Sequence, residues 1–257
     1  MESLVNYIVV WLRDYCRHAQ QTGFVIGISG GVDSALTSVL CARTGLKTLL
    51  LGMPLHQQSD QLVRARDHMK ALNHQFSNVE CLELDLTLAF EAFRTSMPET
   101  TAMHELSMAN TRSRLRMTTL YAVGQANGCL VVGTGNKVED FGVGFYTKYG
   151  DGGVDLSPIA DLTKTEVWAL AKHVGVSAEI VAARPTDGLW GEDRTDEQQL
   201  GATYPELEWA MDFSGDQSIL NAREQEVLSI YRRFNAFNQH KMQPIPVCKI
   251  PQEIRNQ

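Results

Sequence analysis

The sequence predicts an α/β protein with a doubly wound, mainly parallel sheet flanked by helices. Short apolar runs rich in β-branched residues alternate along the chain with segments of helical periodicity. This alternation is typical of parallel strands joined by right-handed helical crossovers. The chain has 257 residues, of which 44% are hydrophobic and 21% charged, so it is long enough to bury a sizeable core. We therefore expect a single domain that spans residues 1–257.

Helices and strands alternate over the first half of the chain. The first segment is predicted to be an amphipathic helix, because Leu4, Ile8, Trp11 and Leu12 recur on one stripe. Later apolar runs are too short for helices and are bounded by turn residues. The predicted strands are residues 24–28, 48–53, 79–84 and 129–133. The predicted helices that follow the first are residues 35–43, 59–72, 86–95 and 106–126.

The second half of the chain is predicted to contain a long loop and then helices. Glycine is dense over residues 142–153, which indicates a mobile loop rather than a linker. Further helices are expected over residues 165–173, 177–183 and 218–239. Since ligands of doubly wound sheets bind beyond the carboxyl ends of the strands, we expect the site after residues 28 and 132.

Composition and charge exclude several classes of function. The 30 acidic against 23 basic residues give a net charge of −7, which disfavours a broad nucleic-acid surface. No apolar run approaches the ~20 residues that a membrane span needs, and the N-terminus lacks the features of a signal peptide. The five cysteines are scattered and form no Cys-x-x-Cys pair, so neither a zinc ribbon nor a redox pair is predicted. We expect a cytoplasmic protein that has no membrane and no nucleic-acid partner.

A glycine-rich octapeptide between a predicted strand and a predicted helix is the strongest functional signal. Its glycines allow an anion to approach the backbone, and the helix N-terminus adds unpaired N–H groups. Asp33 would repel a phosphate unless a cation lies between them, so this carboxylate indicates magnesium. The octapeptide consists of Gly27, Ile28, Ser29, Gly30, Gly31, Val32, Asp33 and Ser34.

Two familiar nucleotide-binding motifs do not fit this segment. A Walker loop ends in Gly-Lys-Ser/Thr, and the dinucleotide fingerprint is Gly-x-Gly-x-x-Gly; the octapeptide matches neither. The alternative without function is a tight glycine-rich turn in which Asp33 caps the following helix.

Residues Ser29 to Ser34 resemble the signature of the ATP pyrophosphatases, which have an adenine-nucleotide alpha-hydrolase-like fold. Three more segments, residues 110–117, 133–140 and 145–155, together with His240 and Lys241, are similar to ammonia-dependent NAD synthetases. The similarity covers nearly the whole chain in the same order. It implies a ligase (EC 6.3.1.5) that amidates deamido-NAD to NAD, the last step of NAD biosynthesis.

The resemblance also implies the reaction and its partners. The substrates would be ATP, deamido-NAD and ammonia, with Mg²⁺ as cofactor, and the products AMP, pyrophosphate and NAD, formed through an adenylated carboxylate. It further implies a homodimer with the dinucleotide at the two-fold interface. Two rivals remain: another adenylating enzyme, such as a tRNA-modifying one, and a non-catalytic nucleotide-binding module.

Three residues outside the octapeptide are candidates on chemical grounds. Glu139 follows a strand and would be a second carboxylate opposite Asp33, fit to hold magnesium; the alternative is a solvated loop acid. Lys164 begins a predicted helix, where a cation opposes the helix dipole, so a bound phosphate is the better explanation. Lys148 lies in a glycine-rich segment that suits closure over a ligand.

The resemblance assigns roles to individual residues. Asp33 and Lys164 would be catalytic, and Asp33 and Glu139 would bind the metal. The ATP contacts would be the octapeptide, Gln58, Thr134, Lys164 and Thr186. The contacts to deamido-NAD would be Arg114, Lys148, Asp155, His240 and Lys241.

Three arginines and two departures from the family pattern bear on these assignments. On a helix, Arg112 and Arg116 share a face and Arg114 points the opposite way. Gly52 stands where many relatives have a basic residue, and Met242 replaces the usual arginine after His-Lys. No cysteine lies in a glutaminase-like context, so free ammonia is the expected nitrogen donor.

Overall fold

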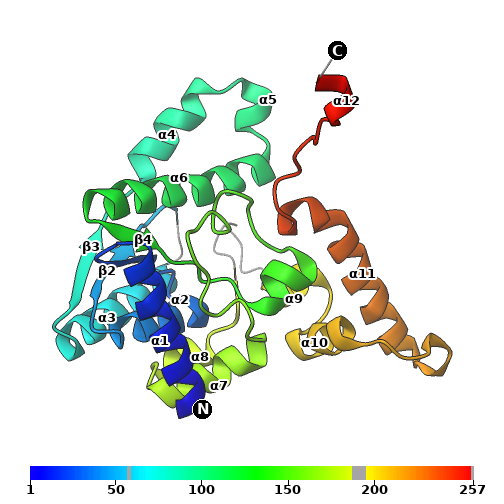
Figure 1. The fold of residues 1–257 in the computed structure, drawn as a ribbon, viewed down its shortest axis with the longest axis horizontal. Helices are drawn as coiled ribbons and strands as arrows, with labels where there is room; N and C mark the ends of the chain where they lie inside the picture. The colour runs from blue at the N-terminus through cyan, green and yellow to red at the C-terminus, as the bar shows by residue number, and fades with distance from the viewer. Residues whose placement is uncertain (57–58, 187–194, 256–257) are drawn as a thin grey trace.

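The structure, a computed structural model, describes residues 1–56, 59–186 and 195–255. A four-stranded parallel sheet with the strand order β3-β2-β1-β4 forms its centre. The strands are β1 (Gly23–Gly27), β2 (Lys47–Gly52), β3 (Val79–Glu83) and β4 (Cys129–Val131). Val25 pairs with Leu49 on one side and with Val131 on the other. The predicted fold class is therefore confirmed (Figure 1).

The helices of the first half cover both faces of the sheet. Alternate residues of β1 point to opposite faces, so Phe24 and Ile26 belong to a core with α1, α2, α3 and α7, while Val25 packs in a second cluster with α6. Figure 1 shows α6 on one side of the sheet and α2 and α3 on the other. The helices of the first half are α1 (Glu2–His18), α2 (Val32–Ala42), α3 (Ser59–Gln75), α4 (Thr87–Ser96), α5 (Glu99–Ala102) and α6 (Glu105–Ala126). Of these, α4 and α5 pack on α6.

The second half adds a smaller apolar cluster, in which Tyr204, Leu207 and Val227 are buried. This cluster joins α10 and α11 to a π-helix, η1, next to the sheet's carboxyl edge. The elements are η1 (Lys137–Val143), α7 (Lys164–Val174), α8 (Ala178–Ala182), α9 (Asp196–Leu200), α10 (Tyr204–Asp212), the 3₁₀ turn η2 (Gln217–Ile219), α11 (Ala222–Met242) and α12 (Gln252–Arg255).

Several predicted boundaries differ from the observed ones. Helix α2 begins at Val32, three residues early, because Gly31 is already the extended N-cap residue. The last long helix begins at Ala222 rather than Ser218, since Asn221 and Glu224 form a capping box there. The predicted loop over residues 142–153 begins inside η1. The predicted strand over 129–133 ends at Val131.

Some elements were not predicted, and one apolar residue was misplaced. The elements η1, α9 and α10 are absent from the sequence prediction, although Thr195 and Thr203 start capping boxes. On α1, Ile8 and Leu12 are buried as expected, but Trp11 is 38% exposed. No helix among the described residues is long and apolar enough to cross a membrane.

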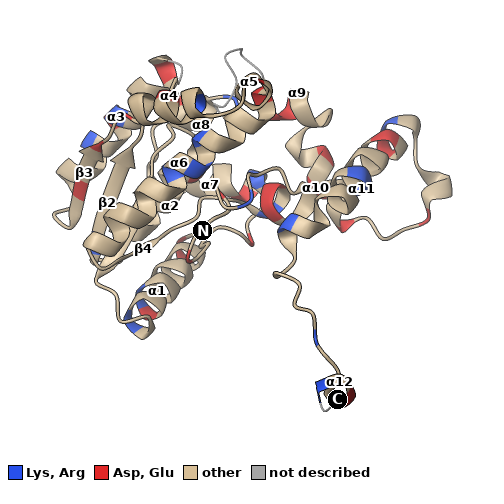
Figure 2. Ribbon diagram, turned by 90° about the horizontal axis from the view of Figure 1, so that it is seen from above, with Lys and Arg blue, Asp and Glu red and all other residues tan. Residues whose placement is uncertain are grey.

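Figure 2 shows the end of the chain running away from the body of the molecule toward α12. Pro244 and Pro246 keep this segment free of regular structure, and Ile245, Val247 and Ile250 are exposed along it.

Candidate active site

The glycine-rich loop between β1 and α2 is held by its own hydroxyl groups. Ser34 Oγ donates to Gly31 O at 3.0 Å, and the Ser29 and Ser34 hydroxyls are 3.0 Å apart. Gly30 has a φ of +86°, and a Cβ there would lie 2.4 Å from Gln61 O. Only glycine therefore fits at residue 30, where the loop passes close to α3.

Asp33 does not cap helix α2, so the alternative reading of this residue is wrong. The N-cap residue is Gly31, without a side-chain cap. Asp33 Oδ2 instead accepts from Lys164 Nζ at 2.6 Å, and its Oδ1 accepts from Asn136 Nδ2 at 3.1 Å. The carboxylate is thus turned across the carboxyl end of the sheet toward residues far along the chain.

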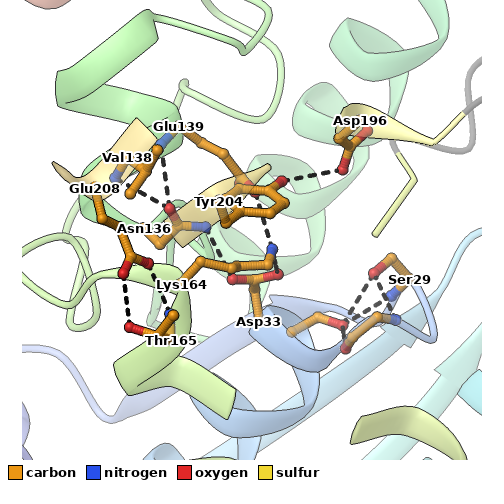
Figure 3. Close-up of polar contacts among 12 residues, drawn as sticks. Ser29, Asp33, Asn136, Val138, Glu139, Lys164, Thr165, Asp196, Tyr204 and Glu208 are labelled. Atoms are coloured by element: carbon orange, nitrogen blue, oxygen red, sulfur yellow. Dashed lines mark hydrogen bonds and ion pairs between the residues drawn. The ribbon is translucent and has the colours of Figure 1, made fainter. Parts of the chain in front are cut away.

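A cluster of two carboxylates and one ammonium group forms the centre of the site (Figure 3). Lys164 Nζ lies 2.6 Å from Asp33 Oδ2 and 2.9 Å from Glu139 Oε1. The lysine side chain is only 2% exposed, and the carboxylate side chains of Asp33 and Glu139 are 18% and 16% exposed. Lys164 reaches this position from the first residue of α7, where Thr163 and Glu166 form a capping box.

Tyr204 and Asn136 fix the orientation of Glu139. Tyr204 Oη donates to Glu139 Oε1 at 2.5 Å and lies 3.3 Å from Asp196 Oδ2. The Asn136 side chain accepts from the backbone N–H of Glu139 at 3.1 Å, at the start of η1. The fully buried Tyr204 ring also lies 4.9 Å from Lys164 Nζ. Glu139 is therefore hydrogen-bonded by Asn136 at the start of η1, by Lys164 of α7 and by Tyr204 of α10.

The charges in this cluster shift one another's pKa values. Burial raises the pKa of Asp33, and Glu139 adds to this rise. Burial also opposes ionisation of Glu139, but the charge of Lys164 and the hydrogen bond from Tyr204 outweigh it and lower the pKa of Glu139. For Lys164 the two carboxylates outweigh burial and raise the pKa. The ammonium form of Lys164 is thus the stable one.

A cleft with a volume of about 260 Å³ opens beside this cluster at the carboxyl ends of the strands. This volume is near the lower end of small-molecule pockets, about 300–1,000 Å³. Most of the predicted ATP and metal residues line it. Those lining residues are Gly27, Ile28, Ser29, Gly30, Gly31, Val32, Asp33, Thr134, Glu139, Lys164 and Thr186.

Among the described residues, one predicted ATP contact, Ser34, does not line the cleft. Ser34 is buried behind the loop, where it holds Ser29 and Gly31. Gln58 lies outside the described residues. Gln61 of α3 does line the cleft, and its Nε2 donates to Thr186 Oγ1 at 2.6 Å.

The residues assigned to deamido-NAD gather outside the cleft lining. Arg114 Nε donates to Lys148 O at 3.2 Å, and Lys148 Nζ donates to His240 O at 2.6 Å. Lys241 Nζ donates to Tyr146 O at 2.8 Å. Four of these residues are therefore neighbours. They lie on α6, on α11 and in residues 144–153, the segment after η1, which we call the strap.

Asp155 is placed differently from the other four. Its Oδ1 accepts from Tyr121 Oη at 2.9 Å, and its Oδ2 accepts from the backbone N–H of Val131 at 2.8 Å. One oxygen is thus bonded to α6 and the other to the edge strand β4.

Arg116 is a cleft residue to which the sequence analysis gave no role. Its Nε donates to Met53 O at 3.2 Å at the end of β2. Burial, with the nearby charge of Arg112, lowers the pKa of Arg116 to about 10. Arg114, by contrast, is exposed, so the expected division of the arginines between two helix faces is confirmed.

Asp151 also lines the cleft, because the strap folds back on α6. Its Oδ1 accepts from Ser113 Oγ at 2.8 Å and from the backbone N–H of Thr147 at 2.9 Å. Burial raises the pKa of Asp151. Thr147 Oγ1 also donates a hydrogen bond to Asn110 Oδ1 at 2.6 Å. These hydrogen bonds pack the strap against α6.

The fold and this site together define a nucleotide-binding α/β protein, in which a glycine-rich loop and a carboxylate–lysine cluster share one cleft. Comparison with known proteins identifies its family. Residues 4–244 match the family model described as NAD synthase. An NH₃-dependent NAD⁺ synthetase of Syntrophomonas wolfei is 39% identical over 99% of both chains. The chain therefore belongs to the NAD synthase family.

Solved structures agree with this assignment. An NMN synthetase of Francisella tularensis is similar with a TM-score of 0.85 and 32% identity over 98% of both chains. An NH₃-dependent NAD synthetase of Campylobacter jejuni gives a TM-score of 0.76 at 25% identity, covering 96% of this chain and 99% of the other. As a family member, the protein is a carbon–nitrogen ligase of ammonia-dependent NAD synthesis.

Proposed function

We propose that the protein amidates deamido-NAD to NAD with ATP and ammonia, in the cleft beside Asp33. The observation that carries this proposal is the meeting of three features in one cleft: the glycine-rich loop, the carboxylates Asp33 and Glu139, and the buried ammonium of Lys164. Membership of the NAD synthase family supports the choice of substrate.

The reaction has two steps. The nicotinate carboxylate attacks the α-phosphorus of ATP and releases pyrophosphate, which leaves an acyl adenylate. Ammonia then attacks the acyl carbon, and AMP leaves. The protein acts by positioning the reactants and neutralising charge, through the N–H groups of the loop and through Lys164. No side-chain nucleophile is needed.

Mg²⁺ fits the donor set that the cleft offers. Among the described residues no group of three metal-ligating side chains occurs, but Mg²⁺ is commonly held by one or two carboxylates together with substrate phosphates. Asp33 and Glu139 are two such carboxylates beside the phosphate loop. When bound there, the ion would neutralise charge on the phosphates.

The proposed contacts to deamido-NAD are Arg114, Lys148, Asp155, His240 and Lys241. Four of these residues lie together next to the strap that ends at the cleft. A homodimer would bring a second copy to this side. Exposed apolar side chains on α1, namely Tyr7, Val10, Trp11 and Tyr15, support such an interface.

Free ammonia is the proposed nitrogen donor, and the cysteines support this choice. A glutaminase needs an activated thiolate. Burial raises the pKa values of Cys16, Cys41, Cys81 and Cys129. Cys248 is exposed in the C-terminal segment, away from the cleft lining. All five are free thiols, which also suits the cytoplasmic location that we infer.

The proposal is tested by following NAD formation from deamido-NAD, ATP, Mg²⁺ and ammonium with the purified protein. We expect one AMP and one pyrophosphate for each NAD. The formation of ADP and phosphate in that ratio would refute the adenylation step. Glutamine at the same concentration should give no NAD; equal rates in a preparation free of glutaminase would refute the choice of ammonia.

A second candidate substrate is the mononucleotide half of deamido-NAD. The similarity to the NMN synthetase of Francisella tularensis over 98% of both chains supports it. The ratio of kcat/KM for nicotinate mononucleotide to that for deamido-NAD decides between the two substrates.

A further inference from the structure

Lys164 occupies the place between the two carboxylates that the metal would use. Its Nζ lies 2.6 Å from Asp33 and 2.9 Å from Glu139, so one ammonium group bridges both side chains. Figure 3 shows it between them. A divalent cation held by the same two carboxylates would meet this positive charge at contact distance, and the two cations would repel each other strongly in a buried site.

Displacing Lys164 without a nucleotide present would be costly. The side chain is 2% exposed, and a buried charge without a partner is strongly unfavourable. Its neighbour across the cluster is the Tyr204 ring, 4.9 Å away, and a ring face is a poor replacement for two carboxylates. The glycine-rich loop, however, lines the same cleft. Phosphates bound there would give the ammonium group a new anionic partner.

The carboxylates themselves are held in place independently of Lys164. Asn136 Nδ2 donates to Asp33 at 3.1 Å, and Tyr204 Oη donates to Glu139 at 2.5 Å. Both donors come from elements that pack in the core, since Asn136 and Tyr204 are fully buried. Removing only the ammonium group would therefore leave two carboxylates that still face one position.

We propose that Lys164 keeps free divalent cations out of the Asp33–Glu139 pair, so that the metal enters only together with a nucleotide. Lys164 then moves from the carboxylates to the phosphates, and the metal takes its place. This inference rests on the metal role proposed for Asp33 and Glu139, but it does not depend on which substrate is amidated.

The test measures Mn²⁺ binding, by the electron paramagnetic resonance of free Mn²⁺, with no nucleotide and no turnover. The variant Lys164→Met keeps the length of the side chain and removes its charge. We expect it to bind Mn²⁺ at least ~10-fold more tightly than the wild type. The matched control is Lys172→Met, an exposed lysine on the same helix, which should bind Mn²⁺ as weakly as the wild type. Equal affinities of Lys164→Met and the wild type would overturn the proposal.

Further variants separate the causes. Lys164→Arg keeps the charge and should still exclude Mn²⁺, whereas the double variant Lys164→Met/Glu139→Gln should lose the new site. Circular dichroism checks that each variant is folded.

If Lys164→Met does not fold, the measurement on the wild type alone tests the proposal. With Mn²⁺ present, the wild-type protein should enhance the relaxation of water protons only when α,β-methylene-ATP is added. Tight Mn²⁺ binding without nucleotide would contradict the proposal. The proposed function fails separately, if no NAD forms.

Discussion

Removal of one hydroxyl group, by Tyr204→Phe, tests whether the second carboxylate must be held in a fixed orientation. Tyr204 Oη donates to Glu139 Oε1 at 2.5 Å, and the tyrosine is fully buried. Phenylalanine keeps the ring, which packs edge-on against Trp168 at 5.8 Å and lies over Lys164. The substitution therefore deletes a charged hydrogen bond with little change in packing.

The expected effect follows from the strength of that bond. A hydrogen bond to a charged group contributes about 1.5–3 kcal/mol, which corresponds to about 10- to 100-fold in an equilibrium or rate constant. We expect kcat/KM for ATP at limiting Mg²⁺ to fall by that factor. Excess Mg²⁺ should restore part of the loss, because Glu139 is still present but less well oriented.

The assay is NAD formation over a Mg²⁺ series, with the unfolding temperature measured in parallel. Tyr231→Phe is the matched control, since Tyr231 packs against the same apolar cluster but does not line the cleft. A Tyr204→Phe enzyme whose activity and Mg²⁺ requirement stay within about twofold of the wild type, well below the expected effect, would refute the positioning role.

Three other substitutions have expected outcomes. Asp33→Asn should lower turnover by at least ~10²-fold, through lost charge stabilisation, while circular dichroism stays unchanged; near-normal turnover would contradict its role. Arg116→Met should raise the KM for ATP by about 10-fold, because its guanidinium charge lines the cleft and suits an anionic ligand; an unchanged KM would show that Arg116 is structural. Burial lowers the pKa of His68 from 6.5 to about 4, so its contribution to stability is present above pH 6.5 and lost as the pH falls toward 4. The free energy of unfolding should decrease over that window by up to about 3 kcal/mol, and denaturant titrations of His68→Gln should lack this part of the decrease.

The fold was predictable because its signals are local. A run such as residues 24–28 is too short and too β-branched for a helix, and parallel pairing follows from the helices between such runs. The octapeptide was predictable as a tight loop between a strand and a helix for the same reason. Its conformation depends on its own glycines and on the strand and helix that flank it.

The supports of the site could not be predicted in this way. Tyr204 carries no motif that points to Glu139, and the two residues are 65 positions apart. Asn136 lies in residues 133–140, a segment similar to NAD synthetases, but nothing in that segment indicates its hydrogen bond to Asp33, 103 positions away. Such contacts depend on how α10 packs against η1. The only signal near Tyr204 is the Thr203–Glu206 capping box, which marks a helix start and not a site.

The arginines of α6 show how far helical spacing alone can be taken. Helical spacing correctly separated Arg114 from Arg116. The resemblance assigned a deamido-NAD contact to Arg114, which stays a prediction, and it assigned no role to Arg116, which lines the cleft. Which face of α6 points inward depends on its packing against β1 and β4, and this information is not contained in the spacing alone.

The cluster around Lys164 also has a consequence for the order in which the protein matures. Its contacts join residues 131, 25 and 65 positions apart, from four separate elements. During synthesis the loop and the sheet strands leave the ribosome first, whereas α10 follows much later. Because contacts between distant segments form late in folding, a nascent chain can build the phosphate loop before Glu139 has its final partners. The arrangement around Glu139 is therefore complete only after the chain has been made past Tyr204.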